Sequence, residues 1–300
     1  MKTVWMFPGQ GSQQVGMGQR LYERFAWARE MYQQAEDILD LPLAEVSFEG
    51  PEERLTQTLF AQPALFVYEA ALVRWLREQG SEPDLTLGHS LGELTALFAA
   101  GAVDFETGLR LVGKRARLMQ QAAEKRAGTM AAVIGLEPDA IDTVLREVSG
   151  TVVAANFNSP GQVVISGEEA AVLEAMERLK ALGAKRVIRL RVSAAFHSPL
   201  MEPAQKEFAE FVDTLPFQEP RCPVIPNATA RATRDPRELR EALKVQLRQP
   251  VRWVDSLREA YRLGGRRFVE IGPGKVLQGL ARRTLEGITV EGINEEIAAP

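Results

Sequence analysis

The chain has 300 residues, 45% of them hydrophobic and 25% charged, which is enough to build the core of one or two domains. Its 36 basic and 40 acidic residues leave a formal net charge of −4, which argues against nucleic acid as the main partner. A single cysteine excludes a disulfide framework and a cysteine zinc cluster, and it fits a reducing, cytoplasmic location. We expect no signal peptide and no membrane span, because no uncharged apolar stretch is long enough.

The first predicted element is a buried strand over residues 3–7, followed by a glycine-rich loop over residues 8–16. A dinucleotide-binding loop of the form G-x-G-x-x-G would need glycine at position 14, where Gln14 stands. A loop after a strand can instead present a backbone N–H to a developing negative charge. Gln10 is the candidate for that donor.

Two helices are predicted next, over residues 18–38 and 63–79. Pro63 is expected at the first position of the second helix, where its missing N–H has no intrahelical partner to lose. A short apolar strand follows at residues 85–87, and residues 94–100 have the composition of a helix. The segment between this strand and this helix is therefore expected to be a sharp turn.

That turn carries Gly88-His89-Ser90-Leu91-Gly92-Glu93. A G-x-S-x-G sequence between a strand and a helix is typical of a nucleophile elbow, in which small residues allow a tight turn that exposes one hydroxyl at a helix N-terminus. Ser90 is the candidate nucleophile, and the N–H of Leu91 is then the first donor to the oxyanion. The alternative is a plain strand-to-helix connection in which Ser90 only caps the helix.

A serine hydroxyl needs a neighbouring base, and histidine is the side chain best suited to that task near neutral pH. The chain has two histidines, His89 and His197. At an elbow the side chain of His89 should project away from that of Ser90. A single histidine in apolar surroundings is often structural, but the shortage of alternatives makes His197 the candidate base.

A helix predicted over residues 105–125 carries three neighbouring cations, Lys114, Arg115 and Arg117. A solvated cationic face is the ordinary interpretation of such a cluster. Arg115 differs because it lies one turn from Leu111 and from Met119, so it leans toward the apolar face of the helix. A guanidinium held there could bind a carboxylate through two parallel hydrogen bonds.

The pattern changes over residues 128–192, where strands and helices alternate as βαββαβ, the split βαβ or ferredoxin-like arrangement. Strands are expected at 129–134, 152–157, 162–166 and 186–190, and helices at 138–148 and 168–182. We predict that this stretch is a small domain inserted into a larger one.

After His197 the chain returns to mixed α/β structure. The predicted elements are helices at 200–214, 236–248 and 251–263, strands at 224–225 and 268–271, and a final helix and strand. Gly272-Pro273-Gly274-Lys275 lacks the spacing of a phosphate-binding loop and is interpreted as a tight turn before a helix.

Taken together, these motifs make the chain similar to the malonyl-CoA:acyl carrier protein transacylases of type II fatty acid synthesis and to polyketide acyltransferase domains. The resemblance runs from the first strand to about residue 294 and rests on residues 7–13, 58–65, 88–93, 156–165, 196–197 and 270–275. It implies an α/β fold with an α/β-hydrolase-like large subdomain, residues 1–127 and 193–300, and an inserted ferredoxin-like small subdomain, residues 128–192.

The resemblance also implies roles for individual residues. Ser90 matches the acylated nucleophile and His197 its base, Arg115 matches the arginine that holds the free malonyl carboxylate, and the amides of Gln10 and Leu91 match the oxyanion hole. The main-chain carbonyl of Gln246 matches the group that orients the base. Gln62 and Asn158 match residues near the acyl pocket, and Phe196 matches the residue that accompanies malonyl selection.

The implied reaction moves a malonyl group from malonyl-CoA to the phosphopantetheine thiol of acyl carrier protein, by a ping-pong mechanism with a Ser-His dyad and a malonyl-serine intermediate. No cofactor, metal, nucleic acid or membrane is expected. The alternatives are a serine thioesterase or esterase, a trans-acting acyltransferase of a polyketide pathway, and a non-catalytic scaffold that only docks carrier protein. Candidate basic contacts for an acidic carrier protein are Lys185, Arg186, Arg189, Arg191, Lys275, Arg282 and Arg283.

Overall fold

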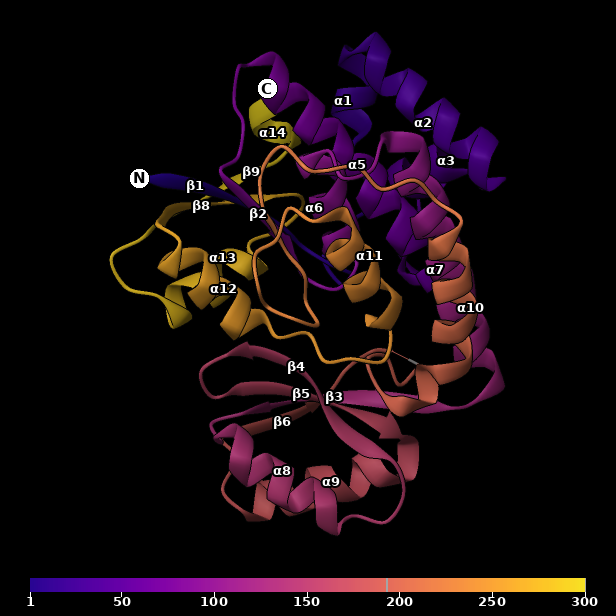
Figure 1. The fold of residues 1–300 in the computed structure, drawn as a ribbon. Coiled ribbons are helices and arrows are strands. Elements are labelled where there is room, and N and C mark those ends of the chain that lie inside the picture. Colours follow the sequence, from indigo (N-terminus) through magenta and orange to yellow (C-terminus); the bar gives the residue numbers. More distant parts are fainter. Residues whose placement is uncertain (193, 300) are drawn as a thin grey trace.

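The computed structural model describes residues 1–192 and 194–299, so the predicted subdomain limits at 193 and 300 lie outside the described residues. Two separate sheets organise the chain, one parallel with five strands and one antiparallel with four (Figure 1). The fold is therefore mixed α/β, as predicted. No helix in the described part of the chain has the length and apolar character needed to cross a membrane.

The parallel sheet has the strand order β7-β2-β1-β8-β9, with the first strand of the chain at its centre. Val4 and Met6 of β1 face one apolar core, and Trp5 and Phe7 face the other. Both faces of the strand are buried because helices cover the sheet on both sides, which is usual for parallel sheets. The strands are β1 (Lys2–Phe7), β2 (Leu85–Gly88), β7 (Val224–Ile225), β8 (Gly265–Ile271) and β9 (Thr289–Ile293).

Helices of very different length surround this sheet. The longest are α5 and α7, which pack against each other beside the sheet (Figure 1). The others have 14 residues or fewer. The helices are α1 (Gln19–Arg24), α2 (Ala26–Leu39), α3 (Leu43–Phe48), α4 (Glu52–Thr56), α5 (Thr58–Glu78), α6 (Gly92–Ala100), α7 (Phe105–Lys125), α10 (Glu202–Asp213), α11 (Pro236–Val245), α12 (Trp253–Arg262), α13 (Val276–Thr284) and α14 (Glu295–Ala298), with a 3₁₀ turn at Pro199–Met201.

The helices predicted over 63–79 and 18–38 differ most from those observed. Pro63 does not begin a helix but lies inside α5, which starts at Thr58. This is possible because residues 60–73 around the proline are all buried, so packing of the apolar residues outweighs the hydrogen bond that proline removes. The helix predicted over 18–38 is two helices, because Phe25 is extended, with φ −115° and ψ 124°. Helices α3, α4 and α14 were not predicted, since each has six residues or fewer.

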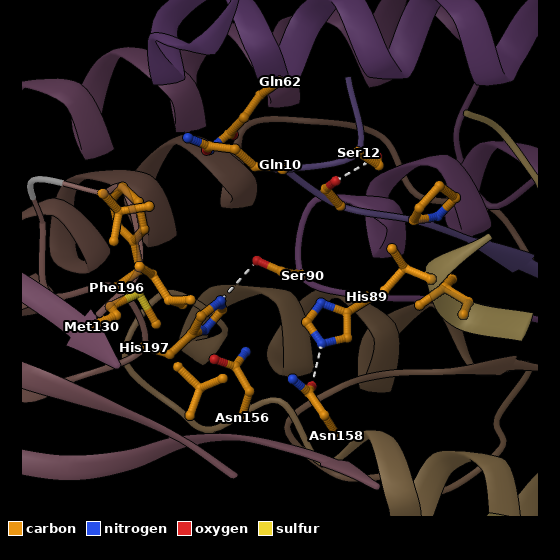
Figure 2. A pocket seen from close by; sticks show the side chains of 18 of the residues that line it. Gln10, Ser12, Gln62, His89, Ser90, Met130, Asn156, Asn158, Phe196 and His197 are labelled. Carbon is orange, nitrogen blue, oxygen red and sulfur yellow. Dashed lines mark hydrogen bonds between the residues drawn. The ribbon is translucent and has the colours of Figure 1, made fainter. Parts of the chain in front are cut away.

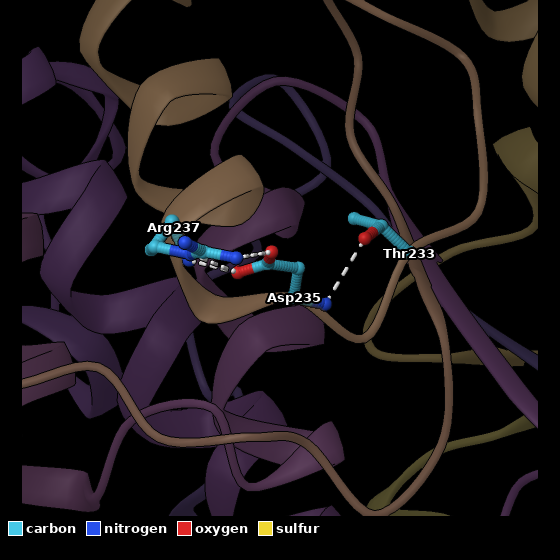
Figure 3. A network of polar contacts seen from close by, with 3 residues as sticks. All are labelled: Thr233, Asp235 and Arg237. Carbon is cyan, nitrogen blue, oxygen red and sulfur yellow. Dashed lines mark hydrogen bonds and ion pairs between the residues drawn. The ribbon is translucent and has the colours of Figure 1, made fainter.

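The start of α11 is set by a local polar network (Figure 3). The Asp235 carboxylate accepts a hydrogen bond from the N–H of Arg237 and pairs with the Arg237 guanidinium, with Nη2 and Oδ2 2.8 Å apart. The N–H of Asp235 donates to Thr233 Oγ1. An aspartate cap of this kind satisfies a free N–H of the first turn. Helix α11 ends at Val245 and is followed by the buried residue Gln246.

The antiparallel sheet comes from one continuous stretch of chain and has the order β4-β5-β3-β6. Its α8 and α9 cover the face turned away from the large sheet (Figure 1). Its other face adds Met130, Ala155 and Val164 to the main apolar core. The βαββαβ succession is as predicted. Its elements are β3 (Gly128–Ile134), α8 (Pro138–Glu147), β4 (Val152–Ser159), β5 (Gln162–Glu168), α9 (Glu169–Ala181) and β6 (Arg186–Arg189).

The two sheets are joined by backbone and side-chain hydrogen bonds as well as by apolar contacts. Val251, just before α12, donates its N–H to Ala155 O and accepts from Phe157 N. The hydroxyl of Ser166 on β5 donates to the carbonyl of Phe196 at 2.6 Å. The small sheet therefore fixes the segment that carries His197.

Candidate active site

The turn between β2 and α6 holds Ser90 in a strained backbone conformation, with φ 53°. The left-handed region is unfavourable for residues other than glycine and is often kept at functional positions. The glycines on either side allow no side chain, because a Cβ on Gly88 would overlap the carbonyl group of Gly92, and one on Gly92 would overlap the carbonyl of Phe7. The predicted elbow geometry is confirmed. The N-cap of α6 is Leu91 and not Ser90, so the alternative that Ser90 caps the helix is wrong.

Ser90 and His197 meet in one cavity although they are 107 residues apart in sequence. The distance between Ser90 Oγ and His197 Nε2 is 2.7 Å, and Figure 2 shows the two side chains pointing toward each other. On the other side of the ring, His197 Nδ1 lies 3.0 Å from the carbonyl oxygen of Gln246 and 3.1 Å from that of Gln249. Carbonyl oxygens only accept, so Nδ1 carries the proton and Nε2 is free to take one from the serine.

Burial lowers the pKa of His197 to about 3, and the nearby positive charge of Arg115 adds to the effect. Its side chain is only 3% exposed. The imidazole is therefore neutral near pH 7, which is the form that can act as a base. The ring is oriented by two carbonyls, and within the described residues no carboxylate contacts it.

The backbone amide of Gln10 lies in the loop after β1, and that of Leu91 lies in the turn between β2 and α6. Within residues 1–192 and 194–299, neither N–H donates a hydrogen bond. Gln10 lines the cavity and Leu91 directly follows Ser90 at the N-terminus of α6. Free N–H groups beside a hydroxyl are suited to a developing oxyanion, and the helix dipole favours negative charge there.

Arg115 is 1% exposed, so it does not belong to a solvated cationic face. Its Nη2 donates to Ser90 Oγ at 3.0 Å, and its Nη1 donates to Gln62 Oε1 at 2.8 Å. Burial lowers its pKa to about 10, while Glu93 opposes the shift. Arg115 remains charged at neutral pH and places that charge directly beside the serine hydroxyl.

The cavity has a volume of about 280 Å³ and lies between the loops that follow β1 and β2 and the strands β3, β4 and β5 of the antiparallel sheet. Gln62, Asn158 and Phe196 all line it, as predicted. His89 also lines it, but its ring turns away from Ser90, packs edge-on against Trp253, and lies with Nε2 2.7 Å from Asn158 Oδ1 (Figure 2). The volume of this cavity is close to the lower end of the range for small-molecule sites, about 300–1,000 Å³.

Besides the Gln249 carbonyl, three contributors to the site were not predicted. The side chain of Asn227 holds the elbow on both sides, because Oδ1 accepts from Ser90 N at 2.8 Å and Nδ2 donates to Gly88 O at 2.6 Å. Asn227 follows β7, which neighbours β2, and the ends of neighbouring parallel strands meet at one edge of a sheet. That rule could have pointed to Asn227. The other two are the buried carboxylate of Glu93 and the side chain of Gln246.

Comparison with known proteins places this geometry in a family. A family model described as acyl transferase domain matches residues 4–300. The chain belongs to this acyl transferase family.

Similar proteins cover nearly the whole chain. The malonyl CoA-acyl carrier protein transacylase of Bacillus subtilis is 42% identical over 285 residues, which span 94% of this chain and 90% of the relative. An acyl carrier protein S-malonyltransferase from Vibrio cholerae, solved as a crystal structure, has a TM-score of 0.93 at 41% identity, covering 98% of this chain and 97% of that one. A malonyl-transacylase solved in complex with its type II PKS acyl-carrier protein has a TM-score of 0.94 at 39% identity, covering 98% and 96%.

Proposed function

We propose that this chain transfers the malonyl group of malonyl-CoA to the phosphopantetheine thiol of acyl carrier protein. The observation that carries the proposal is one serine hydroxyl, Ser90 Oγ, that lies 2.7 Å from a neutral imidazole and 3.0 Å from a buried guanidinium. The first contact suits nucleophilic attack, and the second suits an acyl group that ends in a carboxylate. The similar proteins act on malonyl groups and acyl carrier proteins, which supports the same substrates for this chain.

In the first half-reaction, His197 Nε2 takes the proton of Ser90 Oγ as the oxygen attacks the thioester carbonyl carbon. The resulting oxyanion is stabilised by the N–H groups of Gln10 and Leu91, each contributing roughly a hundredfold or more in rate. Collapse of the intermediate breaks the carbon–sulfur bond. His197 returns the proton to the departing sulfur, so that CoA leaves as a thiol and malonyl-serine remains.

In the second half-reaction, the carrier protein's phosphopantetheine thiol replaces CoA. His197 takes the thiol proton, and the sulfur attacks the serine ester. The carbon–oxygen bond breaks, and Ser90 Oγ recovers its proton from His197. No cofactor takes part, because the phosphopantetheine belongs to the carrier protein.

Selection of the malonyl group is assigned to two residues. Arg115 would bind the free carboxylate through charge-assisted hydrogen bonds, so an acetyl substrate would leave a buried guanidinium without its partner. Phe196 lines the cavity beside His197 and is 8% exposed, which limits the room for a branched acyl group. Gln62 and Asn158 line the same cavity and would contact the acyl group from two further sides.

The proposal is tested by intact mass measurement of the chain after incubation with malonyl-CoA. We expect one malonyl adduct that is absent in Ser90→Ala, persists in buffer, and is lost when holo acyl carrier protein is added. A serine thioesterase would instead lose the adduct rapidly to water without an acceptor. A scaffold that only docks carrier protein would form no adduct.

The thioesterase alternative is also disfavoured by the orientation of the base. In hydrolases with this elbow the histidine is usually oriented by an acidic residue. In this chain two carbonyl oxygens, those of Gln246 and Gln249, accept from Nδ1. A trans-acting acyltransferase of a polyketide pathway would have the same chemistry, so transfer to fatty acid and polyketide carrier proteins should be compared in one assay.

We further propose that the parts built on the two sheets are an α/β-hydrolase-like large subdomain, residues 1–127 and 193–300, and a ferredoxin-like small subdomain, residues 128–192. The parallel sheet with its strand–elbow–helix supports the first description, and the antiparallel order β4-β5-β3-β6 supports the second. The cavity between them would receive the acyl group on its carrier arm.

A further inference from the structure

The side-chain amide of Gln246 uses all of its hydrogen-bonding capacity. Its Oε1 accepts from Arg115 Nε at 3.2 Å and from Arg115 Nη2 at 3.0 Å. Its Nε2 donates to the carbonyl oxygen of Ser90 and to Glu93 Oε2, both at 2.9 Å. An amide has two acceptor positions and two N–H groups, so nothing is left over. Gln246 is 1% exposed, and water cannot replace these partners.

The carboxylate of Glu93 decides which way this amide points. Glu93 is 1% exposed, and its Oε2 also accepts from the N–H of Asn227 at 2.9 Å. If the amide of Gln246 were reversed, its oxygen would face the carboxylate and the Ser90 carbonyl, and its N–H groups would face the guanidinium. The reversed amide would place acceptor against acceptor on one side and donor against donor on the other. Only the observed orientation is therefore compatible with the surrounding groups.

The orientation of Gln246 in turn sets the orientation of Arg115. Because one oxygen accepts from both Nε and Nη2, that edge of the guanidinium is turned toward Gln246, which does not line the cavity. The end of the guanidinium, formed by Nη1 and the second N–H of Nη2, is left to Gln62 and Ser90, which do line it. The guanidinium thus presents its outer edge to the space beside the serine hydroxyl.

The same amide also holds the strained elbow. The carbonyl of Ser90 is bound by Gln246 Nε2, and the N–H of Ser90 is bound by Asn227 Oδ1. A residue at φ 53° keeps this conformation only when the surrounding groups enforce it. One side chain therefore connects the backbone of the nucleophile with the cation beside it.

We propose that the side chain of Gln246, held by Glu93, is the positioning unit that turns Arg115 toward the Ser90 hydroxyl and thereby sets the preference for acyl groups that carry a carboxylate. This role is separate from that of the Gln246 main-chain carbonyl, which contacts His197. The positioning role rests on the proposed malonyl transfer. Measuring the rates of malonyl and acetyl transfer in each variant separates a failure of this role from a failure of the proposed function.

The first variant is Gln246→Met, which keeps the length of the side chain and the main-chain carbonyl but removes the amide. Rates with malonyl-CoA and acetyl-CoA are measured under the same conditions and divided by the fraction of enzyme whose Ser90 can be acylated. Hydrogen bonds to a charged group are strong, so we expect the malonyl-to-acetyl ratio of kcat/KM to fall at least about tenfold, mainly through a higher KM for malonyl-CoA.

Glu93 is tested by two substitutions of similar size. Glu93→Gln still offers an oxygen to Gln246 Nε2 and to Asn227 N, so the ratio should stay within about threefold of the wild type. Glu93→Leu leaves both donors without an acceptor and allows the Gln246 amide to turn, so the ratio should fall as in Gln246→Met. The matched control is Glu69→Gln. Glu69 is a buried residue of α5 that accepts from Thr95 Oγ1 and, within the described residues, forms no hydrogen bond with Gln246, Arg115 or Ser90.

The possible results separate the inference from the proposed function. If the wild-type enzyme transfers no malonyl group, the proposed function is wrong. Wild-type transfer with an unchanged ratio in Gln246→Met, or with equal losses for both acyl groups, would remove the positioning role alone. A loss of ratio in Glu93→Gln as large as in Glu93→Leu would assign the effect to negative charge and overturn the role of hydrogen-bond direction.

Discussion

At the scale of single residues, Arg115 contacts the nucleophile directly. Its Nη2 donates to Ser90 Oγ, the atom that becomes an ester oxygen in the proposed intermediate. An ester oxygen is a weaker acceptor than a hydroxyl oxygen, so acylation would release this N–H as the substrate carboxylate comes within reach. The proposed clamp would then be strongest in the acyl-enzyme.

Arg115→Ala should separate the two acyl groups. We expect kcat/KM for malonyl transfer to fall at least about a hundredfold, since hydrogen bonds between charged groups are among the stronger ones in proteins. Acetyl transfer should be spared or increased, because no buried cation is left without a partner. The control is Arg110→Ala on the same helix, an exposed residue paired with Glu106. Equal losses for both acyl groups in Arg115→Ala would remove the clamp.

The pH dependence should reflect the unusual base. A histidine with an ordinary pKa of about 6.5 would lose roughly tenfold in its neutral form between pH 7.5 and pH 5.5. The pKa of His197 is lowered to about 3, so the ring stays neutral over that range. We expect kcat/KM for malonyl-CoA to change less than about threefold, measured per acylatable enzyme. A tenfold decrease toward pH 5.5 would contradict this prediction.

Much of the site at residue scale could be predicted because its chemistry needs rare residue types. Only two histidines exist, and one of them is next to the serine, so the base followed almost by elimination. Asn227 and the side chain of Gln246 could not be found in this way. Asparagine and glutamine are common, and their roles arise from hydrogen bonds that only the folded chain brings together.

At the scale of elements, the strand–turn–helix from β2 to α6 depends on two glycines with no room for a side chain. A Cβ on Gly88 would overlap the carbonyl of Gly92, the first residue of α6, and a Cβ on Gly92 would overlap the carbonyl of Phe7 in β1. Overlap with backbone cannot be relieved by moving a flexible side chain. The elbow is thus closed by close packing of main chain on main chain.

Gly88→Ala should lower the free energy of unfolding by about 2 kcal/mol or more, because backbone must move to admit the methyl group. The measurement is urea unfolding followed by circular dichroism. Gly279→Ala is the matched control, since it lies in α13 with its nearest neighbour, the Arg283 guanidinium, 3.9 Å from an added Cβ. Alanine is the better helix former there, so this variant should be unchanged or stabilised by up to about 1 kcal/mol. Similar behaviour of both variants would contradict the prediction.

Long elements with regular patterns were predictable, and short ones were not. The helix over 105–125 agrees with α7 to the residue because its apolar stripe repeats over several turns and Asp104 caps it. The start of α5 was missed because a buried helix has no polar face to mark its limits. Pro63 then suggested a beginning where the chain has none.

At the scale of the whole molecule, both sheets contribute to the largest apolar core. Met130, Ala155 and Val164 of the small sheet belong to the same buried cluster as the residues of α5 and α7. Separation of the two parts would expose this shared surface. The molecule should therefore unfold as one unit, as smaller single domains do.

Tryptophan fluorescence provides the test, because all four tryptophans lie in elements of the large sheet or its helices: Trp5, Trp27, Trp75 and Trp253. Circular dichroism reports on both sheets. We expect the two urea transitions to coincide, with midpoints that agree to within about 0.2 M. A change in circular dichroism without a change in fluorescence would show that the small sheet unfolds separately.

The position of β1 at the centre of the parallel sheet has a consequence for synthesis on the ribosome. Its two neighbours are β2, made early, and β8, which ends at Ile271. The antiparallel sheet, in contrast, is complete once residue 189 has emerged. We therefore expect the nascent chain to form its second sheet first, while the earliest strand remains unpaired on one edge until a partner is translated about 260 residues later.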